Sequence, residues 1–356
     1  MRTIVAETHP FIIGVDTHTR THTYAVITAA GEHLCTETFP NSAPGRARAI
    51  AWAARRTVAD REALWVVGGA GSYGAQLSRA ASATGYQVIE ASPMPRRDRG
   101  AKGKSDALDA RHIATATLTL TTDQLRHRRQ EDGTRAAVQV LLTSRDHLTN
   151  ERTRAVNALT ALLRITDLGI DARKPLGAEK ITDIARWRTR AEKPSAAVAR
   201  AEAVRLAKRV HATDTDLREN HARLTEFVAA SPAASLLEWT GVGPVTAAKA
   251  LVVWSHPGRI KNEAAFAAIA GVNPIPASSG NTVRHRLNHR GDRQLNRALN
   301  VIAMVRMVHD PDTRTYVEKR RAEGKTDREI RRVLKRYLAR SIYRELNTAA
   351  STSARG

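Results

Sequence analysis

The chain is organised around one stretch, Gly103-Lys104-Ser105-Asp106-Ala107-Leu108-Asp109-Ala110. Asp106 and Asp109 are three residues apart, so in a helix both carboxylates leave the same face, one turn apart. Ser105 suits the N-cap position, which places both aspartates at the positive end of the helix dipole. Two carboxylates held this close repel each other unless a cation lies between them, and hard oxygen ligands suit Mg²⁺. On these two residues alone, an ordinary acidic first turn is the better interpretation.

The composition points to a polyanionic partner. The 356 residues suffice for two or three domains, and 57 Lys and Arg against 35 Asp and Glu give a net charge of +22. An excess of this size favours nucleic acid as the partner. No apolar run is long enough to span a membrane, no segment has the pattern of a signal peptide, and the single Cys35 excludes a disulfide framework. We therefore expect a soluble, cytoplasmic protein that binds nucleic acid and no membrane.

Strand and helix patterns alternate upstream of the acidic stretch. Strands are expected at 11–16, 23–28, 33–39, 64–67 and 87–90, with helices at 44–58 and 74–84. Three leading strands that can form a meander, followed by alternating helices and strands, predict a mixed sheet covered on both faces. This is the element order of the RNase H-like fold, in which Asp16 on the first strand faces Asp106 and Asp109. Three converging carboxylates in a basic protein predict a metal-dependent phosphoryl-transfer site.

Two long helical patterns follow, at about 134–165 and 195–228, with apolar residues at steps of three, four or seven. They predict an antiparallel coiled-coil arm, and a plain helical hairpin linking two domains is the alternative. Arg145 and Arg152 occupy two positions of the apolar stripe, which hints at contact with another chain or with nucleic acid.

The third region begins near Pro232 with a helix, a turn containing Gly241 and Gly243, and a second helix. The glycines allow a tight turn, and the second helix presents N–H groups to phosphate, which is typical of a helix-hairpin-helix. An ordinary αα-hairpin is the alternative.

A glycine-bearing loop with two adjacent serines, Ser278 and Ser279, lies further along the chain. It is followed by the cations Arg284, Arg286, Arg290 and Arg293. A serine hydroxyl is a poor nucleophile until a base or a metal assists it, and nearby cations can bind the phosphate under attack. A basic loop that contacts DNA explains these residues better when they are considered alone. Lys102 and Lys104, beside the aspartates, are further candidates for binding nucleic acid.

Six motifs follow one another in a fixed order along the chain. They are Gly14-Val15-Asp16-Thr17-His18, Gly71-Ser72-Tyr73-Gly74, Gly103-Lys104-Ser105-Asp106 with Asp109-Ala110, Gly241-Val242-Gly243-Pro244, Phe266-Ala267-Ala268 with Ala270-Gly271, and Ser278-Ser279-Gly280. Their joint order and spacing resemble the DEDD-type insertion-sequence transposases, the insertion-sequence one-ten family, which has the Piv invertases as relatives. The resemblance covers about residues 12–346.

The resemblance implies a RuvC-like catalytic domain at 1–130, a coiled-coil arm at 131–231, a mostly helical transposase domain at 232–348 and a disordered tail at 349–356. It implies a DNA recombinase that uses Mg²⁺ or Mn²⁺ and is guided by a structured non-coding RNA, the bridge RNA. Asp16, Asp106 and Asp109 match the metal-binding acids, and Ser279 matches the serine nucleophile. A homo-oligomer, a dimer or tetramer, is expected at the bacterial nucleoid.

The sequence departs from the family at one acid. The second acid of the family lies four residues before the Ser-Tyr of the glycine-rich turn, where this chain has Gly68. Glu62 and Glu90 are the nearest acids, and either Glu90, after a neighbouring strand, takes its place or metal binding is weakened. Two other functions therefore stay open: a RuvC-like junction-resolving nuclease that uses water, and a catalytically impaired nucleic-acid-binding protein derived from a transposase.

Overall fold

The computed structural model describes residues 3–92, 105–129, 133–277, 285–286, 288 and 291–353. The chain forms two compact units, one of Met1–Glu131 with Ser255–Ala265 and one of Asp132–Trp254 with Phe266–Gly356. Five of the predicted site residues lie outside the described residues: Lys102, Lys104, Ser279, Arg284 and Arg290.

The first unit is built on a mixed six-stranded sheet in the order β3-β2-β1-β4-β5-β6. The strands are β1 (Phe11–Thr17), β2 (Thr21–Thr28), β3 (His33–Pro40), β4 (Leu64–Val67), β5 (Val88–Glu90) and β6 (Arg126–His127). β1, β2 and β3 form an antiparallel meander, β4 and β5 run parallel to β1, and β6 is antiparallel to β5. The predicted mixed sheet is therefore confirmed, with the short β6 as an unpredicted sixth strand.

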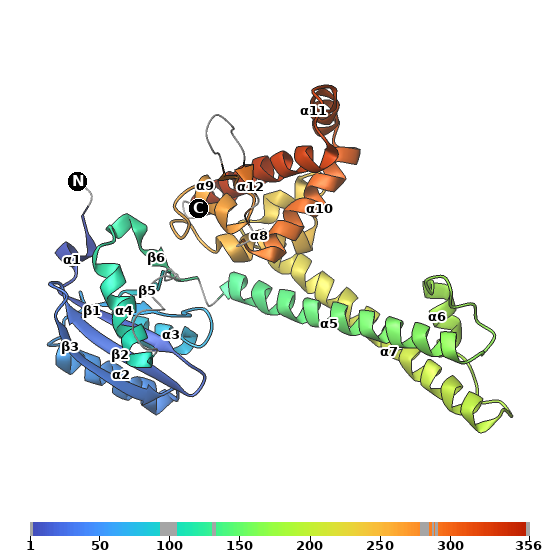
Figure 1. Ribbon diagram of the computed structural model, residues 1–356, viewed down its shortest axis with the longest axis horizontal. Helices are drawn as coiled ribbons and strands as arrows, with labels where there is room; N and C mark the ends of the chain where they lie inside the picture. The colour runs from blue at the N-terminus through green and yellow to red at the C-terminus, as the bar shows by residue number, and fades with distance from the viewer. Residues whose placement is uncertain are drawn as a thin grey trace. The chain divides into compact units, whose positions relative to one another are not determined.

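Helices cover both faces of this sheet (Figure 1). They are α1 (Val5–Thr8), α2 (Ala43–Arg56), α3 (Ala75–Ala83) and α4 (Asp106–Leu118). α2 and α3 pack on one face against alternate strand residues that include Ile13 and Trp65, whereas α4 and α1 pack on the other face against Ile12 and Val66. Because both faces are buried, the central strands are continuous apolar runs.

Gly14 in the middle of β1 sets the approach of α4. A Cβ at this position would lie 2.2 Å from the carbonyl oxygen of Ala110 and 2.7 Å from the amide nitrogen of Ala114. Any larger residue would push α4 away, so the glycine allows the helix backbone to lie directly on the strand. The start of α4 is thereby held near the end of β1.

The second unit contains two long helices, α5 (Gly133–Ile165) and α7 (Pro194–Ala229), which pack antiparallel along their length (Figure 1). α6 (Ala178–Ala185) follows α5 and precedes α7 in the sequence, and it packs against α7. Two arginines of the predicted apolar stripe make contacts within this pair: Arg145 donates to the Leu217 carbonyl and Asn220, and Arg152 pairs with Asp214. These arginines therefore have partners inside the helix pair, and their contact with another chain or nucleic acid stays a prediction.

The remainder of the second unit is a helical cluster. It comprises η3 (Ala234–Glu238), α8 (Pro244–Trp254), α9 (Glu263–Ile269), the short strands β7 (Ile275–Pro276) and β8 (His285–Arg286), α10 (Arg293–His309), α11 (Pro311–Ala322) and α12 (Asp327–Ser353). The first three residues of α9 belong to the first unit. Two differences from the sequence stand out: the helix expected before Gly241 is only a 3-10 turn, and α12 continues to Ser353, into the predicted tail.

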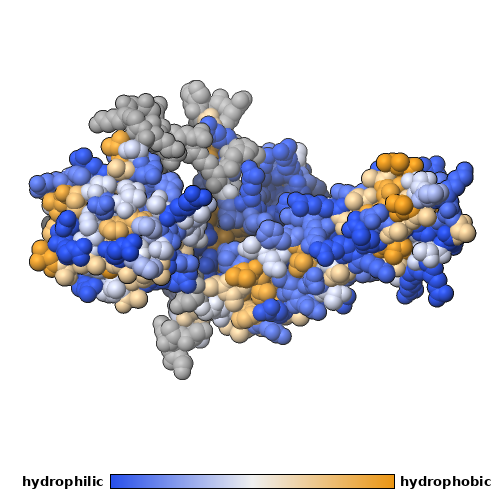
Figure 2. Space-filling view, turned by 90° about the horizontal axis from the view of Figure 1, so that it is seen from below, coloured by the Kyte–Doolittle hydropathy of each residue, from blue (hydrophilic) through white to orange (hydrophobic). Residues whose placement is uncertain are grey.

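The surface carries mainly hydrophilic side chains. Figure 2 shows this for one face, on which apolar side chains gather in small groups. Within the described ranges, no helix is long and apolar enough to cross a bilayer.

Candidate metal site and nucleic-acid-binding residues

Asp16 and Asp106 come together at the end of β1 and the start of α4. Ser105 is the N-cap of α4, and its hydroxyl accepts a hydrogen bond from the Leu108 amide at 3.3 Å, as the sequence predicted. A carboxylate oxygen of each aspartate and Nε2 of His18 all lie within 4.8 Å of one another. His18 Nε2 is 3.1 Å from Asp16 Oδ2 and 3.4 Å from Asp106 Oδ1. Asp16, His18 and Asp106 are called the acidic cluster below.

Asp109 lies near this cluster but is not one of its three converging ligands. Its influence appears in the electrostatics of Asp16. Burial raises the pKa of Asp16, the neighbouring His18 opposes this shift, and the negative charges of Asp109 and Asp106 reinforce it. A cation bound here would relieve the repulsion among these carboxylates.

The cluster is open to solvent on one side. The side chains of Asp106 and His18 are 55% and 49% exposed, whereas that of Asp16 is 21% exposed. One anchored carboxylate and two accessible groups leave room for further oxygen ligands from water or phosphate.

Gly68 directly follows β4, beside Asp16 on the neighbouring strand. Its amide donates to the Val15 carbonyl at 2.8 Å, and its own carbonyl accepts from the Thr17 hydroxyl at 2.6 Å. A Cβ here would lie 3.1 Å from the Val15 carbonyl oxygen and 3.4 Å from Ile113 Cδ1. A side chain here therefore requires its neighbours to shift by a few tenths of an ångström.

Glu90 is engaged elsewhere. Its Oε2 lies 3.8 Å from a guanidinium nitrogen of Arg126 and 3.8 Å from one of Arg259. The Arg259 side chain is only 6% exposed, and it belongs to the segment Ser255–Ala265 that folds with the first unit. Glu90 is not part of the acidic cluster, so the suggestion that it takes the place of the missing acid finds no geometric support.

His18 is the site residue that the sequence reasoning did not identify, although it ends the first motif. It lies two residues after Asp16, and residues two apart along a strand leave the same face. This spacing was the available signal.

The two glycines of the predicted hairpin differ in their surroundings. Gly241 has a φ of +82°, and a Cβ there would meet Val305 Cβ and the Ile302 carbonyl oxygen of α10 at 3.1 Å. Gly243 has open space around it, and its amide donates to the Thr246 hydroxyl at 3.0 Å. Gly243 is therefore exposed but uses its amide within the turn, whereas the positive φ of Gly241 shapes the turn.

The flanks of the serine loop are held together although Ser279 itself is outside the described ranges. β7 pairs antiparallel with β8, with Ile275 opposite Arg286. Arg286 is exposed, and Arg293 is the first residue of α10, also exposed. These two predicted nucleic-acid-binding arginines can therefore reach a ligand.

Two family models match the chain. One, for DEDD-type transposases and described as transposase, matches residues 13–167, and one described as transposase IS116/IS110/IS902 family matches residues 233–318.

Two curated relatives are insertion-element proteins. An uncharacterized 42 kDa protein of insertion element IS900 from Mycobacterium paratuberculosis is 29% identical over 63% of this chain and 66% of its own length. An uncharacterized 43.6 kDa protein of insertion element IS110 from Streptomyces coelicolor is 35% identical over 34% of this chain and 30% of its own length. The matched regions thus span just under two thirds of the first relative and under one third of the second. The two models together cover the acidic cluster and most of the C-terminal helical cluster, and the chain belongs to the IS110 family of insertion-sequence transposases.

Proposed function

We propose that the protein is a DNA transposase that cuts and rejoins strands with Ser279 as nucleophile and a divalent metal at the acidic cluster. The observation that carries the proposal is the convergence of Asp16, His18 and Asp106 within 4.8 Å at the end of β1. The strand order, with an antiparallel meander followed by two parallel strands, supports an RNase H-like, RuvC-like domain. The antiparallel pair α5 and α7 supports a coiled-coil arm.

The donor atoms fit a small divalent cation. Metal–oxygen bonds of about 2.1 Å place adjacent ligands of an octahedron roughly 3 Å apart, which is compatible with the spacing here. The imidazole of His18 suits Mn²⁺ better than Mg²⁺, whose preferred ligands are oxygens. We propose that Asp16, Asp106 and neutral His18 hold the metal and that Asp109 supports it electrostatically. The bound metal would stabilise negative charge on the phosphate and lower the pKa of an attacking hydroxyl.

A protein nucleophile suits recombination. The Ser279 oxygen forms a bond to phosphorus, the phosphorus–oxygen bond to one deoxyribose breaks, and the hydroxyl proton leaves while the released deoxyribose oxygen takes one up. The phosphodiester energy is kept in the serine ester, so a new strand can be joined without ATP. A guide RNA and a homo-oligomer remain part of the proposal, and the net charge of +22 supports a nucleic-acid partner in general.

Two alternatives differ in their chemistry. A RuvC-like junction-resolving nuclease would use water, would need the same acids and would form no covalent adduct. A catalytically impaired binding protein would bind DNA without cleavage, and Gly68 is the feature that favours it.

The test of the metal site uses isosteric neutral substitutions. Asp16→Asn and Asp106→Asn should each abolish Mn²⁺-dependent strand cleavage and rejoining while leaving DNA binding in EDTA unchanged. Asp312→Asn, at an exposed acid of α11, is the matched control and should keep full activity. Full activity in the Asp16 variant would remove the acidic cluster from the mechanism.

A further inference from the structure

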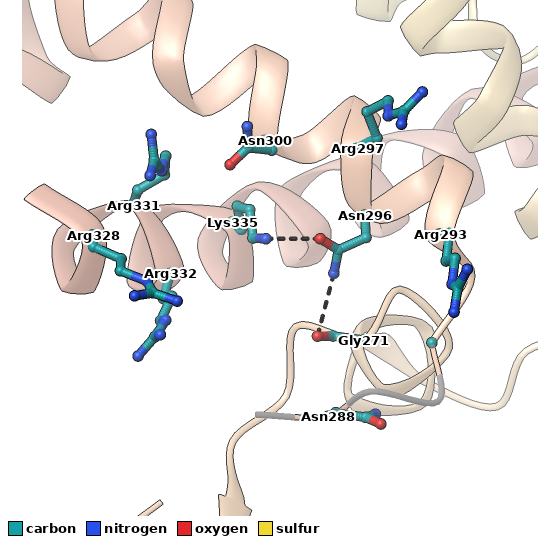
Figure 3. Close-up of a pocket in the computed structure, with 11 residues that line it drawn as sticks. Gly271, Asn288, Arg293, Asn296, Arg297, Asn300, Arg328, Arg331, Arg332 and Lys335 are labelled. Atoms are coloured by element: carbon teal, nitrogen blue, oxygen red, sulfur yellow. Dashed lines mark hydrogen bonds between the residues drawn. The ribbon is translucent and has the colours of Figure 1, made fainter. Parts of the chain in front are cut away.

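A basic pocket of about 510 Å³ lies between α10 and α12 (Figure 3). Six cations line it: Arg293 and Arg297 from α10, and Arg328, Arg331, Arg332 and Lys335 from α12. Its other lining residues are asparagines and glycines, so no acidic side chain from the described residues contributes to its wall. Six positive charges around one hollow form a strong anion-binding potential.

Among the described residues, the five arginines are not used in internal ion pairs. In the part of the chain that the structure describes, none of them lies within ion-pair distance of a carboxylate. Arginine ion pairs form readily elsewhere in this unit, for example between Arg321 and Asp327 at 2.8 Å. Arg293, Arg297, Arg328 and Arg332 are exposed and Arg331 is half-buried, so their guanidinium groups are available to an external ligand.

Lys335 is fixed at the base of the pocket. Its Nζ donates to Asn296 Oδ1 at 2.8 Å, and Asn296 Nδ2 donates to the Gly271 carbonyl at 3.3 Å (Figure 3). Asn296 Nδ2 also donates to the Ala270 carbonyl at 2.8 Å. Burial lowers the pKa of Lys335, and the positive charges of Arg331 and Arg332 lower it further. A cation held in place by a hydrogen-bonded amide is preorganised for an anion.

The pocket wall includes both flanks of the serine loop. Gly271 precedes Ser279 by eight residues, and Asn288 and Gly291 follow it by nine and twelve, and all three line the pocket. The two glycines touch closely, since a Cβ at Gly291 would lie 2.3 Å from the Cα of Gly271. The residues that precede the serine loop and those that follow it therefore both lie at the pocket.

From this arrangement we infer that the pocket binds consecutive phosphodiesters of the DNA strand that Ser279 attacks. The inference rests on the proposed function for the choice of DNA. Planar arginine forks bind phosphate oxygens in bidentate fashion, and a row of them follows a backbone without reading bases. The pocket would hold the strand in register beside the serine loop, so its residues are positioning residues.

The test is DNA binding measured by fluorescence anisotropy in EDTA, so that no cleavage is needed. The double variant Arg297→Gln with Arg331→Gln removes two pocket charges from two helices. Arg154→Gln with Arg314→Gln is the matched control, because it removes two exposed arginines of the same unit outside the pocket. Each lost phosphate contact lowers the slope of log affinity against log salt by about 0.9, so the pocket variant should lose about 1.8. At 0.1 M salt this corresponds to roughly 60-fold weaker binding.

Asn300→Asp provides a second variant, because it introduces a carboxylate into the pocket at nearly constant volume and should also weaken binding. Circular dichroism and thermal melting verify the fold of each variant. An unchanged salt slope in the double variant, together with unchanged affinity in Asn300→Asp, would overturn the inference. Equal losses in the pocket and control variants would do so as well.

Competition with RNA of the same length and sequence tests the choice of strand. Unlabelled DNA should displace the labelled DNA from the wild type. The pocket variant should bind DNA more weakly than the wild type does. If the pocket variant loses RNA binding alone, the pocket serves an RNA and the assignment to DNA is overturned. These outcomes are independent of Ser279 chemistry: normal pocket binding without strand exchange would contradict the proposed function only.

Discussion

Gly68→Glu restores a carboxylate beside Asp16, and its effect can be worked out from the structure. Side chains on adjacent strands start about 5 Å apart, and two like charges at that distance repel by roughly 3 kcal/mol at an effective dielectric constant of about 20. Asp16 is 21% exposed and position 68 is half-buried, so water screens part of this repulsion. We expect the variant to lose about 1–2 kcal/mol of unfolding free energy in EDTA.

Metal should offset this loss of stability. With a fourth ligand we expect the Mn²⁺ dissociation constant to fall about tenfold, which adds roughly 1.4 kcal/mol of stabilisation at saturating metal. Mg²⁺-dependent strand cleavage should rise as well. Calorimetric titration with Mn²⁺ and denaturation with and without metal measure the two quantities.

Gly68→Gln is the control for this experiment. It has the same size and meets the same contact of 3.1 Å with the Val15 carbonyl oxygen, but it adds no charge. If Gly68→Glu and Gly68→Gln respond equally to metal, position 68 does not face the metal and the geometry of the site is wrong.

Three further substitutions test other parts of the account. His18→Ala should weaken Mn²⁺ binding about tenfold or more in calorimetry, whereas His33→Ala, at an exposed histidine of β3, should not. Asp310→Ala removes the N-cap of α11 and should cost about 1–2 kcal/mol in chemical denaturation. Burial raises the pKa of Asp310, but hydrogen bonds from Thr313 and Arg306 outweigh burial and hold this pKa below its usual 3.8. The stability that the Asp310 carboxylate contributes is therefore present above pH 3.8 and is lost as the pH falls below it. Asn220→Ala removes a buried hydrogen bond to the Leu141 carbonyl and should cost about 1–2 kcal/mol, and an unchanged melting curve would contradict its role between α5 and α7.

The sheet and the acidic cluster were predictable because local signals agreed with the fold. Apolar runs marked the strands, and Ser105 marked the start of α4 as an N-cap. The element order then required Asp16 and Asp106 to converge, as the structure has them. Gly14, whose contact with Ala110 holds α4 on β1, was present in a motif, but its role depends on a long-range contact.

Other features depend on partners distant in sequence and were not predictable. β6 has only two residues, which pair with Ile89 and Glu90 at the edge of β5. The sequence suggested an external partner for Arg152. Its internal partner, Asp214 on α7, lies 62 residues away in the sequence, so no local pattern indicated the pair. The segment Ser255–Ala265 joins the first unit through contacts such as that of Arg259 with Glu90, which no local pattern announces.

The basic pocket was visible in the sequence only as charge. Arg331, Arg332 and Lys335 make the sequence of α12 basic, but their grouping with Arg293 and Arg297 depends on the packing of α10 on α12. Helical periodicity gives the face of one helix and does not specify which helix it meets.

The most direct measurement of the central claim is the covalent protein–DNA adduct. End-labelled DNA carrying the element junction is incubated with protein and Mn²⁺, quenched in denaturant and resolved by gel electrophoresis, and the attachment site is mapped by mass spectrometry. Ser278 provides an internal control with the same chemistry one residue away. We expect wild type and Ser278→Ala to form the adduct on Ser279, and Ser279→Ala to bind DNA normally without forming it. Strand exchange by Ser279→Ala, or cleavage by the wild type with no adduct, would contradict the account in favour of a nuclease that uses water.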